Sequence, residues 1–183
     1  MAIITNIIII ILELVGLYIS ISRRKWKVFA YYTQISNIIA FISSVCFVAA
    51  PGSSFSIMLR YVSTVMLIVT FIVTTCVLIP MGGDAHELMF AGNGLYHHTL
   101  VPILSVFSYI FLEPHIQNKA FIFIPLIISM IYGFTMLYMN YAHKFDGPYP
   151  FFRVHNQSVM ASILWITGLM ISIFALSFGV YLL

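Results

Sequence analysis

The chain has 183 residues, of which 62% are hydrophobic and only 7% are charged. A soluble domain carries roughly 25% charged residues, so the composition excludes a water-soluble protein and predicts an integral membrane protein. The net charge of +3 does not indicate nucleic-acid binding, because the basic residues lie at the edges of apolar segments. The length suits a single transmembrane domain, 1–183, without a soluble domain.

Six apolar segments, each close to the roughly 20 residues that a helix needs to cross a bilayer, predict an all-α polytopic bundle. The predicted spans are Ala2–Ser22, Val28–Ala50, Ile57–Pro80, Leu95–Leu112, Ala120–Ala142 and Ser158–Leu183. Spanning strands are excluded, because the apolar runs are too long and do not alternate with polar residues.

The basic residues predict an orientation in the membrane. Those in the odd-numbered loops are Arg23, Arg24, Lys25, Lys27, Lys144 and Arg153, whereas Lys119 and Arg60 lie toward the other side. Cytoplasmic loops carry an excess of Lys and Arg. The odd-numbered loops are therefore expected in the cytoplasm, with both termini outside.

The first span contains Glu13 near its middle. An ionisable residue at this depth has to be protonated, paired or turned toward a wet cavity. We therefore expect Glu13 to point into the bundle. Arg60 lies nearer the opposite face, and we expect its long side chain to reach water and anchor the third span.

The second span opens with a polar cluster, Thr33-Gln34-Ile35-Ser36-Asn37. We place Thr33 about five residues into this span, roughly 8 Å deep at the rise of an α-helix. Thr33, Ser36 and Asn37 share one helix face. Such side chains either hold neighbouring helices together or mark a functional site. A threonine becomes a nucleophile only where a base lies within hydrogen-bond reach.

The fourth span opens with His97 and His98, whose rings should point about 100° apart on a helix. Pro102 cannot donate a hydrogen bond to the His98 carbonyl, so the helix is expected to kink or open there. The histidines are either a catalytic base and its neighbour or simply packed polar groups. No HExxH-type spacing predicts a metal site. Both polar clusters follow odd-numbered loops, so they should lie near the same membrane face.

Three segments resemble the androgen-induced-gene family of multipass membrane hydrolases and its bacterial relatives. They are Tyr31–Asn37, Tyr96–Pro102 and Gly147–Phe151. The resemblance implies a Thr nucleophile and a His that together hydrolyse fatty acid esters of hydroxy fatty acids. It places the nucleophile at Thr33. The spacing between the histidine and the following proline in animal members places the histidine at His97, whereas the spacing in bacterial relatives places it at His98. The resemblance also implies a bacterial cytoplasmic membrane.

The leading hypothesis is an intramembrane lipid ester hydrolase that forms an acyl-threonine intermediate on Thr33 and needs no metal or organic cofactor. Its expected partner is a membrane lipid or fatty acyl ester. The candidate substrate-binding or oxyanion-stabilising residues are Gln34, Asn37, Glu13 and Tyr149. One alternative is a six-helix substrate-binding subunit of a small-molecule transporter, which the bulky residues around a lone Gly16 disfavour. The other alternative is a non-catalytic lipid-binding protein.

Overall fold

A computed structural model describes residues 1–183 and confirms the all-α prediction. Six helical segments are long and apolar enough to cross a membrane, so the chain is an integral membrane protein. The main helices are α1 (Ala2–Arg24), α2 (Tyr32–Ala49), α3 (Ser54–Val73), α6 (Val101–Leu112), α7 (Phe123–Tyr141) and α8 (Val159–Tyr181). Two short helices, α4 (Ala85–Met89) and α5 (Gly92–Gly94), lie in the segment expected to be a loop.

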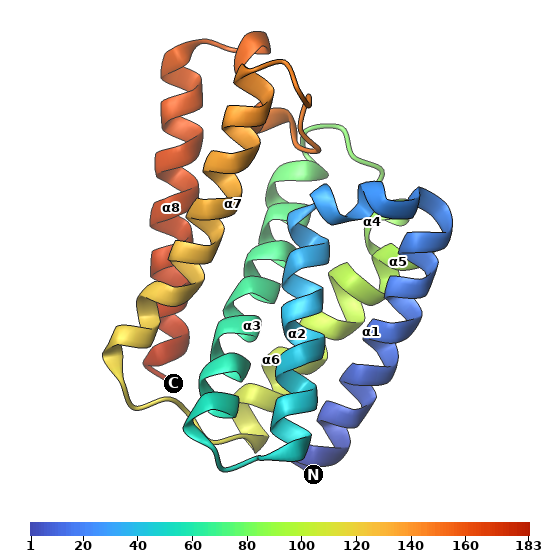
Figure 1. Ribbon diagram of the computed structural model, residues 1–183, viewed down its shortest axis with the longest axis vertical. Helices are drawn as coiled ribbons and strands as arrows, with labels where there is room; N and C mark the ends of the chain where they lie inside the picture. The colour runs from blue at the N-terminus through green and yellow to red at the C-terminus, as the bar shows by residue number, and fades with distance from the viewer.

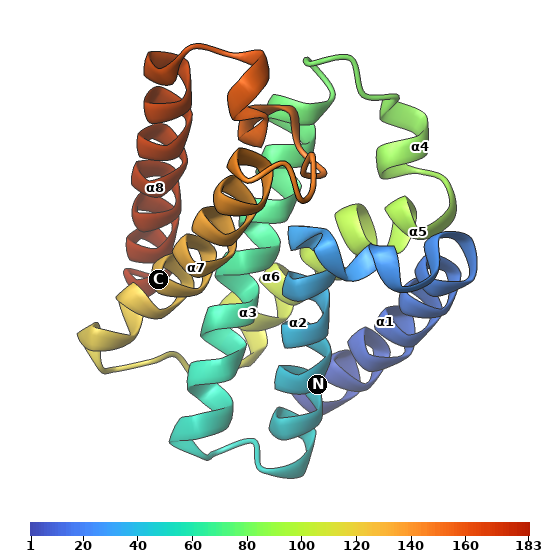
Figure 2. The same cartoon turned by 45° about the horizontal axis from the view of Figure 1, so that its top comes forward.

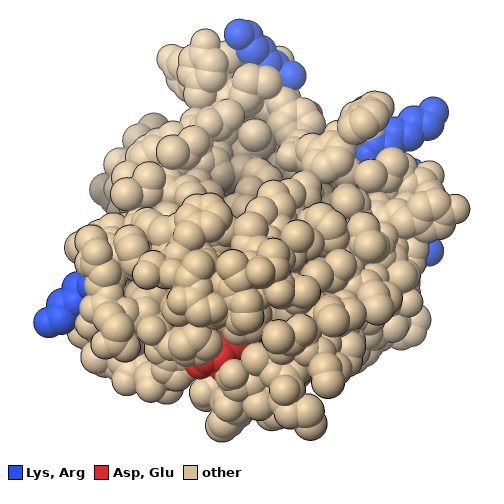
Figure 3. All heavy atoms as spheres, turned by 60° about the horizontal axis from the view of Figure 1, so that its bottom comes forward, with Lys and Arg blue, Asp and Glu red and all other residues tan.

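The helices form two groups that meet at α3. Helices α1, α2, α3 and α6 pack against one another, whereas α7 and α8 form an antiparallel pair that leans on α3 (Figures 1 and 2). Both termini lie at the lower end in Figure 1, and the connections that follow α1, α3 and α7 lie at the upper end. The face around the termini is mostly uncharged, with basic groups at its edge (Figure 3).

The connection between α1 and α2 corrects the predicted start of the second span. Residues Lys25–Ala30 form a 3₁₀ helix across the end of the bundle, and α2 begins only at Tyr32. Lys25 has a φ of 50°, which ends α1, and the extended Tyr31 separates the two helices. Thr33 is therefore in the first turn of α2, close to the mouth of the bundle, and not five residues deep.

Two π-helical segments interrupt the spans at one level. Thr74–Leu78 continues α3, and Leu95–Leu100 precedes α6. The second segment is the opening expected from Pro102, whose missing N–H leaves the His98 carbonyl without its helical partner. The side chains of Thr74 and His98 join the two segments, with Oγ1 and Nδ1 3.1 Å apart. Single π turns occur frequently at functional sites.

A buried ion pair ties the first group of helices together at the end near the termini. Arg60 donates through Nε and Nη2 to the Glu113 carboxylate at 2.8 and 3.0 Å. Glu113 also accepts from Asn6 of α1 at 2.8 Å, and Arg60 donates to Ser44 of α2 at 3.2 Å. Because the Arg60 side chain is fully buried, the expectation that it reaches water is wrong.

Arg60→Ala should lower the free energy of unfolding by about 3–5 kcal/mol, because it leaves the buried Glu113 carboxylate without its partner. Reversible unfolding of the purified protein in detergent micelles measures this change. Arg153→Ala, which removes an exposed arginine, is the matched control and should change little. The double variant Arg60→Met/Glu113→Met should lose less free energy of unfolding than the sum of the losses in Arg60→Met and Glu113→Met. Equal losses in Arg60→Ala and Arg153→Ala would contradict this role.

Candidate functional site

Two cavities of opposite character meet at Thr33. The first has a volume of about 80 Å³, and 16 of its 21 lining residues are hydrophobic. The second, about 420 Å³, has only 6 hydrophobic residues among its 19. Thr33, Leu78 and Tyr149 line both cavities. A polar hydroxyl therefore stands at the boundary between an apolar chamber and a polar one.

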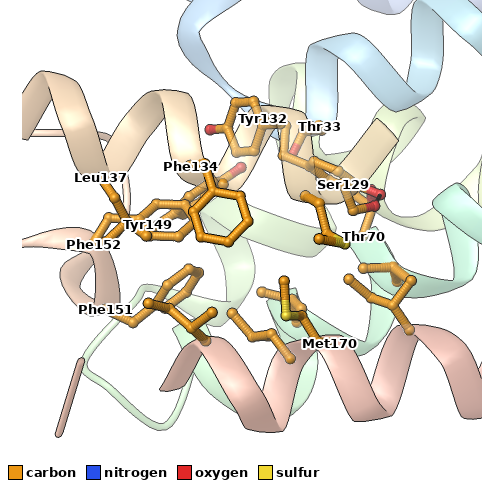
Figure 4. Close-up of a pocket in the computed structure, with 18 of the residues that line it drawn as sticks. Thr33, Thr70, Ser129, Tyr132, Phe134, Leu137, Tyr149, Phe151, Phe152 and Met170 are labelled. Carbon is orange, nitrogen blue, oxygen red and sulfur yellow. Dashed lines mark hydrogen bonds between the residues drawn. The ribbon is translucent and has the colours of Figure 1, made fainter. Parts of the chain in front are cut away.

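The apolar cavity lies between α2, α3, α7 and α8. Aromatic and aliphatic side chains, among them Phe134, Phe151 and Met170, form its walls (Figure 4). Several of the polar groups at its edge are already paired, as in the hydrogen bond of 2.8 Å between the hydroxyls of Tyr32 and Ser129. Hydrocarbon is the ligand chemistry that such a lining favours.

The polar cavity opens among the loops at the upper end of the bundle. His98 lines this cavity together with Thr33, Gln34 and Arg24. Thr33 and His98 come from the two polar clusters that were expected near the same membrane face, and they line one cavity. Nδ1 of His98 lies 3.1 Å from Thr74 Oγ1. Thr74 can therefore hold the imidazole in the tautomer that leaves Nε2 free to accept a proton.

His97 points elsewhere, as expected for neighbouring helical residues. Its ring is fully buried and belongs to the lining of neither cavity. Nδ1 lies 3.1 Å from Gln34 Nε2, and Nε2 lies 3.4 Å from Glu13 Oε2. Glu13 is only 3% exposed, so it points into the bundle as its position in the membrane requires.

The polar residues of α2 have different surroundings. Gln34 lines the polar cavity and also lies 3.2 Å from Ser20 Oγ on α1. Asn37 lines neither cavity, and its amide donates to the backbone oxygens of Thr33 and His97 at 2.6 and 3.4 Å. Gln34 is therefore part of the wall of the polar cavity, whereas the visible contacts of Asn37 hold α2 against the histidine segment.

Tyr149 comes from the loop between α7 and α8. Burial raises the pKa of its phenol, and hydrogen bonding with Thr33 partly opposes this effect. The ring stacks on Phe151 with centroids 5.2 Å apart. Gly147, with a φ of 75°, provides the turn before it. The protonated phenol is therefore held beside Thr33, where it can donate a hydrogen bond.

Sequence reasoning missed Thr74 and Ser20. Both lie in apolar runs where a single hydroxyl is ordinary for a membrane helix, so no local signal distinguishes them. Their contacts with His98 and Gln34 arise only from helix packing. The structure contains no group of three or more His, Cys, Asp or Glu side chains placed to hold a metal ion.

Comparisons of the chain with protein-family models, curated proteins and solved structures found no match. The relation to the androgen-induced-gene family therefore remains a proposal that rests on the three short motifs.

Gly16→Ala should disturb the packing of His97, because a Cβ at this position would overlap the ring nitrogen Nε2. Alanine stabilises a helix relative to glycine by about 1 kcal/mol. A loss of stability in Gly16→Ala would therefore come from the steric overlap with His97. Gly168→Ala on α8 is the matched control, because a Cβ there meets nothing within 4 Å. We expect Gly168→Ala to raise the unfolding free energy and Gly16→Ala to lower it. A gain in both variants would contradict the close approach.

Proposed function

We propose that this protein is an intramembrane lipid ester hydrolase, related to the androgen-induced-gene family, in which Thr33 is the nucleophile and His98 the general base. One observation carries the proposal: Thr33 lies where the apolar and polar cavities meet, and His98 lines the polar cavity. A nucleophile needs a base within hydrogen-bond reach, so the proposal requires the Thr33 hydroxyl and the His98 imidazole to meet in this cavity when an ester binds. Because Thr33 lies between an apolar and a polar cavity, the substrate is expected to have an apolar part and a polar part.

The two cavities suggest how an acyl ester would bind. Its hydrocarbon chain would enter between α7, α8 and α3 and occupy the apolar cavity. The ester carbonyl would then reach Thr33, and the alcohol part would extend into the polar cavity. Because many large apolar side chains of α8, such as Leu164 and Ile171, are exposed, this side of the bundle faces lipid and suits entry from the bilayer.

The proposed reaction has two steps. Thr33 Oγ1 attacks the ester carbonyl carbon while Nε2 of His98 takes the hydroxyl proton, and the developing negative charge resides on the carbonyl oxygen. As the C–O bond to the alcohol breaks, His98 returns the proton to the leaving oxygen, leaving an acyl-threonine. Water then attacks the acyl carbon while the same imidazole takes its proton. As the bond from the acyl carbon to Thr33 Oγ1 breaks, the imidazole returns the proton to Oγ1 and a fatty acid is released. The Tyr149 phenol and the Gln34 amide are the proposed donors to the oxyanion.

His98 is preferred over His97 because only His98 lines a cavity with Thr33. This choice agrees with the histidine spacing of the bacterial relatives. The proposal therefore includes a bacterial cytoplasmic membrane. The excess of Lys and Arg near the site would place the catalytic end toward the cytoplasm and both termini outside.

A fluorophosphonate probe should label Thr33 covalently in the purified wild-type protein. Thr33→Ala should abolish labelling, and Thr33→Ser should retain part of it because the hydroxyl survives. His98→Ala should slow labelling about 100-fold, as expected for loss of a general base. His97→Ala is the comparison variant and should have a smaller effect, because its ring does not face the cavity. Labelling rates, with the modified residue identified by mass spectrometry, give the measurement.

Undiminished labelling of Thr33→Ala would refute the nucleophile. A stronger effect of His97→Ala than of His98→Ala would refute the choice of base. A folded wild-type protein that binds acyl esters, but neither hydrolyses them nor reacts with the probe, would refute hydrolysis. That result would favour the lipid-binding or transport reading instead.

Filling the apolar cavity should change the preferred chain length. Gly133 lines this cavity, and a Cβ there would meet only the Phe152 ring, at 3.8 Å. Gly133→Leu should therefore fold but favour shorter acyl chains when hydrolysis of a series of p-nitrophenyl esters is compared. Gly168→Leu, outside both cavities, is the matched control and should keep the wild-type preference. An unchanged preference in Gly133→Leu would mean that acyl chains bind elsewhere.

A further inference from the structure

Three neighbouring buried side chains each carry a polar atom without a hydrogen-bond partner. The atoms are Glu13 Oε1, His97 Nε2 and Gln34 Oε1, and none of these residues is more than 3% exposed. Unpartnered buried polar atoms are rare in native proteins, and each requires an explanation. The three residues come from α1, the π segment and α2, and they are in contact through His97.

The direction of the Gln34 amide decides how this chain of groups is protonated. The two ends of an amide have nearly the same size, so hydrogen bonding determines which end faces which neighbour. If the NH₂ end faces His97, Nδ1 has to accept and the ring proton sits on Nε2. That proton then faces Glu13, which accepts it either as a carboxylate or through the carbonyl oxygen of a neutral carboxyl group. In both cases the Gln34 oxygen remains unpartnered, and a neutral Glu13 would also leave its own O–H without an acceptor.

No Lys or Arg is placed to stabilise a Glu13 carboxylate, and His97 could do so only as a buried imidazolium. Helix α2 carries no charged residue, and no Lys or Arg forms an ion pair with Glu13. Arg23 and Arg24 lie at the end of α1, where Arg24 donates to the Tyr31 hydroxyl at 2.6 Å. The other polar side chains of the histidine segment, Tyr96 and His98, do not supply a fixed positive charge. An unpaired carboxylate within the bilayer is expensive, so the carboxylate arrangement is disfavoured.

We propose that Glu13 stays protonated and donates to His97 Nε2, and that His97 Nδ1–H donates to the Gln34 oxygen. Ser20 Oγ–H donates to the same oxygen. The Gln34 NH₂ group then takes the position now held by Oε1, which is buried. Because Gln34 lines the polar cavity, this group is the donor that meets an acceptor oxygen, such as an ester carbonyl, when a ligand enters that cavity. This arrangement gives a partner to His97 Nε2 and to Gln34 Oε1 without a buried charge. Glu13 and His97 are then positioning residues that act through Gln34.

The role toward an ester rests on the proposed hydrolase function, whereas the proton arrangement does not. The same amide donor would bind any neutral carbonyl compound in the cavity. The test therefore has a spectroscopic arm that needs no catalysis and a labelling arm that does.

The spectroscopic arm uses the full-length wild-type protein, labelled with ¹⁵N-histidine and reconstituted in lipid nanodiscs. The resonances of His97, assigned by their loss in His97→Asn, should show a neutral ring with the proton on Nδ1. Infrared spectra should contain the carbonyl stretch of a protonated carboxyl group that is absent in Glu13→Gln and present in Asp146→Asn, an exposed control. A His97 proton on Nε2, or no protonated carboxyl band assigned to Glu13, would overturn the proposal.

Glu13→Gln also guards against a variant that fails to fold. Its side-chain N–H can still donate to His97 Nε2, so the variant should keep the Nδ1–H tautomer while losing the carboxyl band. If His97→Asn is unfolded, the histidine signal that shifts in Glu13→Gln without changing tautomer identifies His97. A change of the His97 tautomer in folded Glu13→Gln would contradict the proposed series of hydrogen bonds from Glu13 through His97 to Gln34.

In the labelling arm, Gln34→Met keeps the length of the side chain but removes the amide donor. The rate of Thr33 labelling should fall about 100-fold, as for other losses of one oxyanion donor. An unchanged rate would overturn the ligand-binding role of Gln34. If the wild-type protein is not labelled but the spectra are as expected, the hydrolase proposal fails and the proton arrangement stands. If labelling occurs and His97 carries its proton on Nε2, this inference fails alone.

Discussion

The Arg60–Glu113 ion pair is the interaction on which the arrangement of the first group of helices depends. In hydrocarbon, a charged side chain without a partner is expelled or neutralised, so each of these two residues requires the other. The carboxylate accepts from residues of α1, α3 and α6, and the guanidinium also reaches α2. Four helices are thus joined at one end, and the histidines and Thr33 are presented at the other.

The site depends on residues that are far apart in the chain and brought together by this packing. Thr33 is at the start of α2, His98 is in the segment before α6, and Tyr149 is in the loop after α7. The polar atoms around them form two layers. His98 lines the polar cavity and contacts Thr74, which lines the apolar cavity, whereas Glu13 and His97 lie behind Gln34. The neighbouring histidines therefore serve different purposes, although they are adjacent in the sequence.

The sequence predicted the number of spans, the helical class and the opening near Pro102, because these follow from apolar length and from the missing proline N–H. It also predicted that Glu13 points inward, since the cost of a carboxyl group in lipid does not depend on the fold. It did not predict the start of α2, because a basic and aromatic run reads as a helix or as an interfacial turn. The pairing of Arg60 with Glu113 and of His98 with Thr74 was missed, because both join residues from different helices.

The π segment Leu95–Leu100 has a consequence for the rest of its span. A π turn is equivalent to one extra residue inserted in an α-helix, and one residue corresponds to about 100° of rotation. Without the insertion, a helix that kept His98 in the cavity would turn Ser105 away from Arg60, with which it now shares a hydrogen bond of 3.2 Å. The π segment therefore determines how far one end of the span is rotated about the helix axis relative to the other end. It allows one continuous apolar segment to present a histidine at one membrane face and serines to an ion pair at the other.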